Sequence, residues 1–454
     1  MERSDGRRAI VIGGGMAGLL AARVLAESCG QVTLLERDRY PAEPVFRAGV
    51  PQGRHVHVLL AKGQALLEDL FPGFIARLVE QGAVETNALR DHAVRYPTGW
   101  LPRATSPLSL YCCTRPLLEG LVRQELLRTS PVKMVEGYEV TDLHFDARGQ
   151  TVTGVHARRR GHEAAEHEAG ELDLEADLVV DASGRDSHVL RWLEAGGFPL
   201  PRETVLDPSL GYASCFYQPG EGSERTWHGM IMATYPPHMR RGGTITPVEG
   251  GRWHVVLAGM SGDYPPTEPE AFLDFARGML DPAFAVALES AERVSPIYGY
   301  RRTANRWRHF ERLRRFPDGL FVIGDAVCAF DPVYGQGMSV AAMGAQALKT
   351  CLARQAGEQQ AGLSLRFQRT LARLNRTPWD LSVGADYRAL PPEEQTRGWL
   401  SRLVNRYFDR MTDLMPASAT LCLAFGDVAH LLRSPVTLFH PTIVWTVFTT
   451  RKQT

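Results

Sequence analysis

The sequence predicts a mixed α/β (α+β) protein built from three parts, and three patterns support this fold class. At the N-terminus an apolar strand pattern alternates with a helical one, as in a parallel sheet covered by helices. Residues 211–260 contain several runs of alternating apolar and polar residues, which indicate a separate antiparallel sheet. Beyond Gly362 the pattern is helical, so a C-terminal helical region is expected.

Residues 9–36 carry the strongest local motif of the chain. An apolar strand pattern is followed by the spacing Gly-x-Gly-x-x-Gly, a helical pattern of small residues, and a second strand pattern that ends in an acid. This order is the context that a dinucleotide fingerprint requires. The residues of the motif are Gly13, Gly15, Met16, Ala17, Gly18 and Glu36.

Each part of this motif has a physical role in binding a dinucleotide. Gly13 makes the tight turn, Gly15 lets the backbone approach a pyrophosphate, and Gly18 lets helix and strand pack closely. The N-terminus of the helix favours an anion, and Glu36 accepts hydrogen bonds from ribose hydroxyls. The motif therefore predicts a Rossmann-like dinucleotide-binding domain, and by itself leaves NAD and FAD as alternatives.

Length and composition bound the remaining choices. A chain of 454 residues with 44% hydrophobic and 22% charged residues is typical of a globular protein of two or three domains. A formal net charge of zero argues against a nucleic-acid partner, and no apolar run reaches the roughly 20 residues of a membrane span. The apolar tail at 437–449 is expected to dock on the protein's own core. The seven scattered cysteines predict reduced thiols and a cytoplasmic location.

The elements between these landmarks follow from local patterns. A Pro-rich loop after Glu36 carries Arg37 and Arg47, and Arg115 lies at the start of a predicted helix. His55 and His57, two residues apart, would point to opposite faces of an extended segment, and no cluster has metal-ligand spacing, so no metal is predicted. The other expected elements are helices at 58–70, 116–128, 268–280 and 337–352, a β-meander at 132–180, strands at 176–181 and 319–324, and helix breaks at Pro378, Pro391-Pro392 and Pro416.

A second glycine-containing segment near residue 330 distinguishes FAD from NAD as the predicted cofactor. Gly324-Asp325 ends a strand pattern, and Gly335-x-Gly337 begins a helix whose backbone N–H groups face something electron-rich. The pyrimidine edge of a flavin fits this description, and Asp325 is suited to the hydroxyls of the flavin's linking chain. The fingerprint and this segment together predict FAD.

On these residues the sequence resembles the single-component FAD-dependent monooxygenases with the para-hydroxybenzoate hydroxylase fold. The tract Gly49-Val50-Pro51-Gln52-Gly53-Arg54-His55-Val56-His57 and residues 295–340 resemble, more narrowly, bacterial epoxidases that act on polyene precursors of polyether antibiotics such as lasalocid and monensin. The resemblance implies that Arg47 and Arg115 approach the FAD pyrophosphate or ribityl chain, and that Pro332 lies beside the flavin. It also implies that Gly335, Gly337 and Met338 line the pyrimidine edge.

One departure from the family pattern concerns the electron source. Where many members carry an Asp-Gly motif that serves FAD and NADPH, this chain has Asp181-Ala182-Ser183-Gly184. The electrons are therefore expected from NAD(P)H or from a separate flavin reductase.

The resemblance further implies that reduced FAD takes up O2 to form a C4a-hydroperoxide, which passes one oxygen atom to an alkene of an apolar polyene, polyketide or terpenoid substrate of secondary metabolism. No Ser/His/Asp set, metal cluster or paired carboxylate stands out, and an epoxidation needs no general base for its substrate. The candidate substrate-pocket residues are His57, Tyr212, Phe216, Met232, Tyr235 and Trp253.

Other functions of the same fold stay open. An aromatic hydroxylase is the runner-up, and an isoprenoid double-bond reductase or a non-catalytic FAD-binding protein are the alternatives of another class. A flavin halogenase would need a lysine between flavin and substrate and a Trp-x-Trp-x-Ile-Pro signature, of which Gly99-Trp100-Leu101-Pro102 is only a fragment, and Lys62 is the one nearby lysine.

The predicted domains are discontinuous. Residues 1–65, 110–200 and 295–358 are expected to form the FAD-binding domain, 66–109 and 201–294 the substrate-binding domain, and 359–454 the C-terminal helical region.

Overall fold

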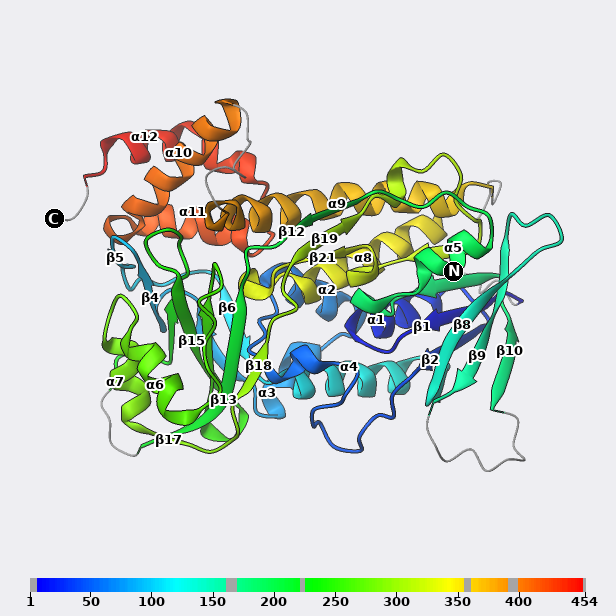
Figure 1. The fold of residues 1–454 in the computed structure, drawn as a ribbon, viewed down its shortest axis with the longest axis horizontal. Helices are drawn as coiled ribbons and strands as arrows, with labels where there is room; N and C mark the ends of the chain where they lie inside the picture. The colour runs from blue at the N-terminus through cyan, green and yellow to red at the C-terminus, as the bar shows by residue number, and fades with distance from the viewer. Residues whose placement is uncertain (1–5, 161–169, 221–224, 355–360, 391–398, 452–454) are drawn as a thin grey trace.

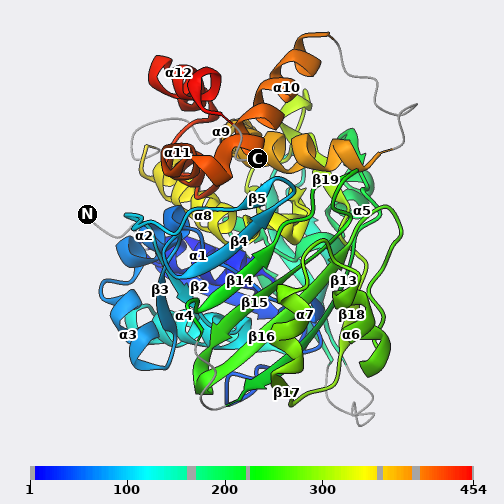
Figure 2. The same cartoon turned by 90° about the vertical axis from the view of Figure 1, so that its left-hand side faces the viewer.

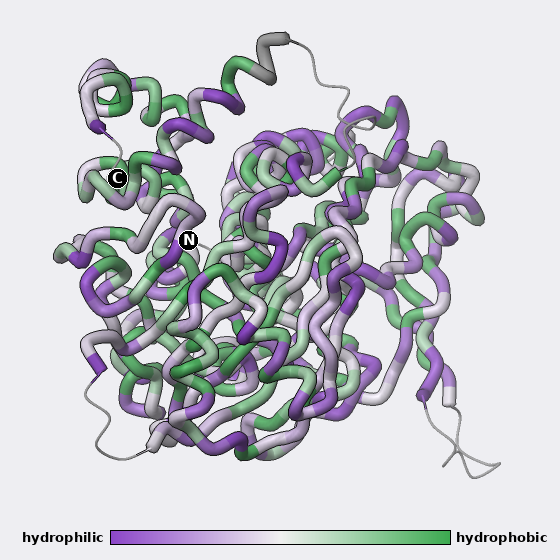
Figure 3. The backbone as a smooth tube through the Cα atoms, turned by 60° about the vertical axis from the view of Figure 1, so that its left-hand side comes forward, coloured by the Kyte–Doolittle hydropathy of each residue, from purple (hydrophilic) through white to green (hydrophobic). Residues whose placement is uncertain are grey.

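The computed structural model describes residues 6–160, 170–220, 225–354, 361–390 and 399–451. A parallel sheet and a large antiparallel sheet lie along the longest axis of the molecule, and the C-terminal helices lie beyond the end of the antiparallel sheet (Figure 1). This arrangement confirms the predicted mixed α/β fold. Hydrophobic segments run through the body of the molecule and continue into the C-terminal helices (Figure 3).

The parallel sheet is the Rossmann-like part of the fold. Its five strands run in the order β20-β11-β1-β2-β7, and every neighbouring pair is parallel. The central strand β1 is buried on both faces, as a parallel sheet requires. The bounds are β1 (Arg8–Ile12), β2 (Gln31–Glu36), β7 (Val132–Glu136), β11 (Leu178–Asp181) and β20 (Leu320–Val322).

Helices and a small meander cover this sheet. Helix α1 packs against β1 and β2 and is flanked by α4 and α8, while β8 and β9 of the meander contact β2 and β11. The prediction of a meander over 132–180 was wrong at both ends, because β7 and β11 belong to the parallel sheet. The bounds are α1 (Met16–Leu25), α2 (Ala61–Leu70), α3 (Phe74–Glu80), α4 (Arg115–Thr129), α5 (Val189–Ala195), α8 (Gly337–Ala353), β8 (Tyr138–Phe145), β9 (Val152–Arg159) and β10 (Glu171–Glu175).

The large sheet has eight strands in the order β17-β13-β16-β15-β14-β4-β5, with β18 paired to β13. All its pairs are antiparallel except β14 with β4. Its strands are β4 (His92–Tyr96), β5 (Gly99–Trp100), β13 (Gly211–Pro219), β14 (Gly229–Met232), β15 (Arg241–Val248), β16 (Arg252–Gly259), β17 (Ala291–Arg293) and β18 (Tyr298–Tyr300).

Alternation along β13 separates the two faces of this sheet. Ala213, Cys215 and Tyr217 share a core with α6 (Pro269–Arg277) and α7 (Ala283–Glu289). Tyr212 lies on the opposite face, which is turned toward the parallel sheet. Figure 2 shows α6 and α7 against one face of this sheet, and Tyr212 on the other face lines a cavity.

Two small sheets join the parts. Strand β12 (Glu203–Leu206) pairs with β19 (Asn305–Arg308), which pairs with β21 (Cys328–Ala329). Strand β3 (Val84–Asn87) pairs with β6 (Ser109–Cys112). The domain boundaries drawn from the sequence stay a prediction.

The C-terminal region is helical, as expected. It contains α9 (Leu363–Asp386), α10 (Trp399–Leu414), α11 (Ala419–Ala429) and α12 (Pro441–Thr449). The break at Pro416 is confirmed, because a short 3₁₀ turn separates α10 from α11. The break at Pro378 is wrong, since this proline lies inside α9, where it is buried. Pro391-Pro392 lie outside the described residues.

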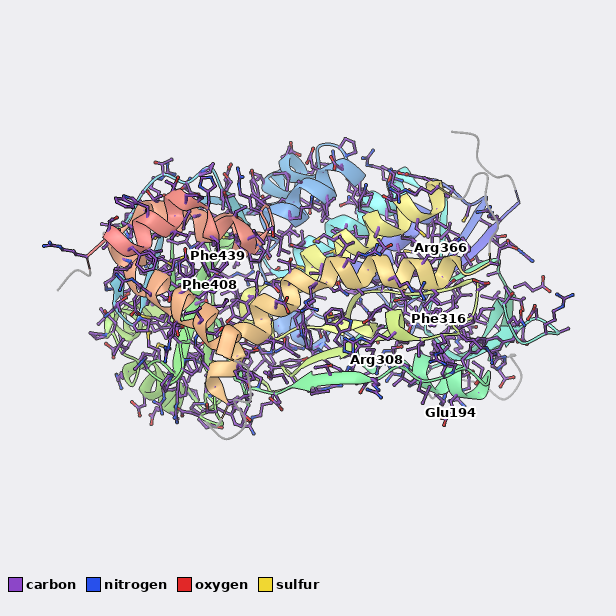
Figure 4. The ribbon with its side chains drawn as sticks, turned by 90° about the horizontal axis from the view of Figure 1, so that it is seen from above. Glu194, Arg308, Phe316, Arg366, Phe408 and Phe439 are labelled. Atoms are coloured by element: carbon purple, nitrogen blue, oxygen red, sulfur yellow. The ribbon has the colours of Figure 1, made fainter. Side chains whose placement is uncertain are left out.

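The apolar tail docks only in part. Leu438 and Val447 are fully buried, whereas Trp445 and Phe448 are 71% and 64% exposed. Figure 4 shows Phe408 and Phe439 in this helical end of the molecule, where their rings lie 5.8 Å apart. Within the described residues, no helix combines the length and the hydropathy needed to cross a membrane.

Candidate functional site

The three fingerprint glycines adopt the geometry that their roles require. Gly13 has a φ of +93°, which a tight left-handed turn needs, and a Cβ on Gly18 would lie 1.8 Å from the carbonyl oxygen of Gly13. A Cβ on Gly15 would instead meet no atom within 4 Å. Gly15 therefore stands at the N-terminus of α1 beside open space, where an anion has room to approach the backbone.

The acid at the end of β2 is buried in a network of charges. Glu36 accepts a hydrogen bond of 2.7 Å from the backbone N–H of Gly14, and Arg47 Nη1 lies 3.3 Å from Glu36 Oε2. Arg47 also pairs with Glu119 at 2.8 Å, and Glu119 pairs with Arg115 at 2.5 Å. Burial acts to raise the pKa of Glu119, but the charges of Arg115 and Arg47 outweigh it and lower that pKa. The two arginines are thus held in place by carboxylates next to the fingerprint.

The second predicted segment faces the fingerprint across the same space. Gly324 has a φ of +61°, and a Cβ there would lie 2.9 Å from the Cβ of Ala17. Gly335 also has a φ of +61°, and a Cβ there would collide with the side chain of Val58. Gly337 begins α8 with nothing within 4 Å of a Cβ, so the helix N-terminus is open. The two helix N-termini therefore border one cavity from different parts of the chain.

This cavity has a volume of about 1250 Å³. That volume exceeds the roughly 300–1,000 Å³ of most ligand pockets, so a cofactor and a substrate have room together. All the predicted cofactor residues line it except Gly18, whose role is packing. They are Gly13, Gly15, Met16, Ala17, Glu36, Arg37, Arg47, Arg115, Asp325, Pro332, Gly335, Gly337 and Met338.

The lining residues fit FAD. The open backbone at Gly15 suits its pyrophosphate, and the open N-terminus of α8 at Gly337 suits the electron-rich edge of a flavin. The Oε1 atom of Gln336, which precedes that helix, is buried without a hydrogen-bond partner and therefore offers an acceptor to a flavin N–H group. Asp325, one-third exposed and 3.7 Å from Arg185, offers acceptors to the hydroxyls of the linking chain.

The predicted substrate residues divide into two groups. His57, Tyr212, Met232 and Tyr235 line the cavity. Phe216 and Trp253 do not, which corrects that part of the prediction. The ring of Phe216 stacks on His254 at 4.4 Å, and Trp253 points into the core beneath α6 and α7. Trp253 lies on the core face of its strand, and the sequence did not show which face met the cavity. Phe216 lies on the same face of β13 as Tyr212, but it contacts His254 instead of the cavity.

Sequence reasoning did not identify which residues of the C-terminal helices line the cavity. Val404 and Phe408 of α10, Phe425 of α11 and the strand residue Tyr96 line the cavity beside Met232. The hydropathy of α10 and α11 marks their apolar faces, but nothing local in the sequence shows which part of the protein those faces cover.

Four histidines of the cavity, His55, His57, His92 and His430, are neutral at physiological pH. Burial lowers the pKa of His57 to about 3, and it lowers those of His55, His92 and His430 to about 4. His55 Nδ1 lies 2.8 Å from the hydroxyl of Ser214, and His57 Nδ1 lies 2.9 Å from the carbonyl oxygen of His55. These rings are therefore hydrogen-bonding groups of low basicity.

The expectation that no paired carboxylate exists was wrong. Asp331, which precedes Pro332, lines the cavity and is hydrogen-bonded to the carboxyl group of Asp386 in α9. The two acids are 55 residues apart in the sequence, and no spacing rule connects them.

One group with metal-ligand chemistry exists among the described residues, far from the predicted histidines. His144, His156 and Asp173 of the meander bring their ligand atoms within 4.8 Å of one another. Asp173 Oδ1 lies 3.0 Å from His144 Nε2 and 2.9 Å from His156 Nδ1, so hydrogen bonds account for this cluster. None of the three lines the cavity.

Known proteins share this architecture. The chain is 31% identical to Protein Rv3254 of Mycobacterium tuberculosis (strain ATCC 25618 / H37Rv) over 384 residues, which are 83% of this chain and 80% of that protein. It is 27% identical to kynurenine 3-monooxygenase of Salinispora arenicola (strain CNS-205) over 371 residues, which are 76% and 72% of the two chains.

Solved structures share the fold at low identity. The flavin-dependent halogenase CmlS superposes with a TM-score of 0.65 at 18% identity, over 95% of this chain and 77% of CmlS. PqsL of Pseudomonas aeruginosa, in complex with 2-aminobenzoylacetate, superposes with a TM-score of 0.62 at 16% identity, over 84% and 97% of the two chains.

A family model described as "FAD binding domain" matches residues 7–367, which contain the fingerprint, both glycine segments and the eight-stranded sheet. The chain therefore belongs to the FAD binding domain family, as an enzyme of the FAD-dependent monooxygenase class.

Proposed function

We propose that this enzyme inserts one oxygen atom from O2 into a carbon–carbon double bond of an elongated apolar substrate, such as a polyene, polyketide or terpenoid of secondary metabolism. The observation that carries this proposal is the shape and chemistry of the cavity. It extends from the fingerprint to the C-terminal helices, and its far end is lined by Tyr96, Met232, Tyr235, Phe408 and Phe425. An apolar chain is the substrate that such a wall desolvates best.

Bound FAD supplies the activation of O2 and the transfer of one oxygen atom. The protein's own residues hold the cofactor at Gly15 and Gly337, and α10 and α11 exclude water from the substrate end. Exclusion of water protects a reactive oxygen donor from side reactions. The neutral histidines present hydrogen bonds to the substrate without taking its protons.

Aromatic hydroxylation is the second candidate, and one observation favours it. Phenol hydroxylation benefits from a group that accepts the phenolic proton, and the Asp331–Asp386 pair places an acid able to exchange a proton on the cavity wall. The relatives named kynurenine 3-monooxygenase are in keeping with this alternative. The large apolar end of the cavity favours the alkene.

A halogenase is disfavoured by the cavity lining. None of the described residues that line it is a lysine, and Lys62 lies on α2 outside the lining. The structural likeness to CmlS is a likeness of fold.

We propose NAD(P)H or a separate flavin reductase as the electron source. The side chain of Asp181 is fully buried and accepts hydrogen bonds from Ser183 and Ser187, so it is not free to serve a second nucleotide. This supports a reductase partner. The seven cysteines are all free thiols, which supports our proposal of a cytoplasmic location.

The test is an oxygenation assay with the FAD-loaded enzyme. A linear polyene and a phenol of similar mass are each incubated with NADPH, and in parallel with a flavin reductase, and products are identified by mass spectrometry with ¹⁸O2. We expect one labelled oxygen in the polyene. A labelled phenol with unlabelled polyene would establish the hydroxylase instead.

Two further outcomes would contradict any monooxygenase proposal. A product that gains two hydrogens without label would indicate a double-bond reductase. A bound flavin that no donor reduces would indicate a non-catalytic FAD-binding protein.

A further inference from the structure

Two buried acids meet below the loop that contains Pro332, each from a different part of the chain. Asp331 ends the segment that leads into the 3₁₀ turn Pro332–Tyr334, and Asp386 is the last residue of α9. Their exposed fractions are 0% and 1%, and their carboxyl groups are hydrogen-bonded to each other. Two carboxylates can form such a bond only if one of them carries a proton.

The other polar atoms around the pair are already satisfied. Asp331 Oδ1 accepts hydrogen bonds from the backbone N–H of Val333 at 2.7 Å and from the hydroxyl of Tyr212 at 3.4 Å. Asp386 Oδ2 accepts a hydrogen bond of 2.6 Å from the amide of Asn305. The remaining oxygens, Asp331 Oδ2 and Asp386 Oδ1, are buried and receive no hydrogen bond from any described donor. One proton between them satisfies both.

Asn305 fixes the geometry of the pair. Its Oδ1 accepts hydrogen bonds of 2.8 Å from the backbone N–H of Asp331 and from the hydroxyl of Ser382. The amide therefore contacts the loop and α9 at the same time. This arrangement holds both acids beside the same amide group.

No described cation contacts either carboxyl group. Arg388, just beyond α9, pairs with Asp409 at 2.7 Å, and Arg185 donates its hydrogen bonds to the carbonyl oxygens of Ala304 and Phe330. The other titratable groups facing the pair are Tyr212, Tyr334 and Asp207. Burial raises the pKa of Asp331 to about 7, and burial with the charge of Asp331 raises the pKa of Asp386.

We propose that Asp331 and Asp386 hold one shared proton and that Asp331 donates it to an oxygen anion formed at the flavin end of the cavity. The proposal rests on the oxygen-inserting function proposed above. Asp331 is the donor because it lines the cavity, and Asp386 is a positioning residue that acts through it.

The stoichiometry of oxygen insertion supplies a use for this proton. Substrate, O2, a two-electron hydride donor such as NAD(P)H and one H⁺ give the oxygenated substrate, the oxidised donor and water. One oxygen atom forms the new bonds to carbon and the other leaves as water. The O–H bond at the acid pair breaks, its electron pair stays on the carboxylate, and a new O–H bond forms on the departing oxygen. Water in the cavity then returns a proton to the pair.

The first experiment tests the shared proton by infrared spectroscopy of the full-length protein loaded with FAD, without substrate. We expect the C=O stretch of a protonated carboxylic acid near neutral pH, and its loss in Asp331→Asn and in Asp386→Asn. Ser382→Ala is the matched control, because it touches the same network through Asn305 but carries no acid, and it should keep the band. A wild-type spectrum without the band, or a band that survives in both Asn variants, would overturn the proposal.

The second experiment tests proton donation. Asp386→Asn gives Asp331 a permanent donor and removes the neighbouring charge, so Asp331 should be ionised at neutral pH. We expect the rate of oxygen insertion to fall by about 10²-fold or more, the usual contribution of a general acid, and its pH profile to move to lower pH. Ser382→Ala should keep the wild-type profile. An unchanged rate and profile in Asp386→Asn would show that the pair gives no proton to the reaction.

The two experiments fail separately. If the infrared band behaves as expected and no substrate is oxygenated by the wild-type enzyme, the proposed function is wrong and the proton site stands. If oxygenation occurs without the band, the function stands and the acid pair does not.

Discussion

The hydroxyl of Tyr235 donates a hydrogen bond of 2.8 Å to Asp409 and so joins the large antiparallel sheet to helix α10. Arg388 also pairs with Asp409 and lies over the ring of Tyr235, 4.8 Å from its centroid. Tyr235 lines the cavity. The Tyr235 hydroxyl also lies 3.0 Å from Thr412 Oγ1, so polar contacts of this hydroxyl with residues 174 and 177 positions away in the chain close the wall of the cavity.

Removing this contact should loosen α10 from the sheet. Tyr235→Phe keeps the ring but loses a hydrogen bond that contributes about 1 kcal/mol to stability. We expect faster hydrogen–deuterium exchange in residues 233–239. Tyr407→Phe is the control, because the Tyr407 hydroxyl donates to Leu438 in the tail and does not touch the sheet. Equal exchange at 233–239 in the two variants would contradict the role of Tyr235.

Two glycines of the fingerprint should respond in opposite ways to alanine. Gly15→Ala places a methyl group in open space, so the fold should keep its stability while the Kd for FAD rises about tenfold or more, which is about 1.4 kcal/mol of binding. Gly18→Ala forces its methyl group against the carbonyl oxygen of Gly13 and should lower stability by about 1–3 kcal/mol. Thermal unfolding of the FAD-free protein and titration with FAD separate the two effects. Loss of stability in Gly15→Ala would show that this site is structural.

The buried arginine beside the fingerprint should matter far more than an exposed one. Arg47→Ala leaves Glu36, Asp38 and Glu119 without their shared cation, and breaking such a buried pair costs about 3–5 kcal/mol. Arg8→Ala breaks an exposed pair with Glu175 and should cost less than about 1 kcal/mol. Urea denaturation gives both values. If the two variants lost similar amounts of unfolding free energy, burial of the Arg47 network would add nothing to stability.

The raised pKa of Asp331 contributes stability that is lost as the pH rises. An unfolded Asp has a pKa of about 3.9, whereas the pKa of folded Asp331 is about 7. The folded state therefore keeps a proton that the unfolded state loses, and the stability that this proton supplies is full below about pH 4 and lost by about pH 7. The slope reaches about 1.4 kcal/mol per pH unit in between.

The neutral histidines of the cavity act in the opposite direction. Their pKa values are lowered in the folded protein, so their stabilising effect is present above about pH 6.5 and is lost as the pH falls. The free energy of unfolding should therefore be measured for the wild type and for Asp386→Asn over the same pH range. From about pH 5 to about pH 7 the free energy of unfolding of the wild type should decrease relative to that of Asp386→Asn, because the histidine contribution is the same in both proteins and cancels in the difference. Parallel curves would contradict the raised pKa.

The parts of the site that the sequence predicted are those encoded by local geometry. The turn at Gly13, the open backbone at Gly15 and the left-handed Gly335 are properties of a few neighbouring residues, and their spacing specifies them. The wrong assignments have a different cause. Trp253 is predicted in the pocket because alternation identifies two faces of a strand without showing what each face meets. Phe216 is on the same face as Tyr212, and the sequence does not show that its ring stacks on His254.

The acid pair and the cavity wall were missed for a related reason. Asp331 meets Asp386 only because Asn305 of β19 contacts both residues, and such a long-range contact has no local signature. The sequence predicts a break at Pro378 because a helix interior loses a hydrogen bond at proline. In α9 the neighbouring Trp379 and Leu371 are buried in the main core, and this packing supports the helix through the proline.

The family match ends at residue 367, near the start of helix α9, whereas Asp386, Phe408 and Phe425 all follow it. The residues matched to the FAD binding domain therefore include the fingerprint and both glycine segments, while the second acid and part of the cavity wall are encoded in the last fifth of the gene. A chimera in which this final segment is replaced by that of a relative should oxidise a different substrate. Its Kd for FAD should stay unchanged.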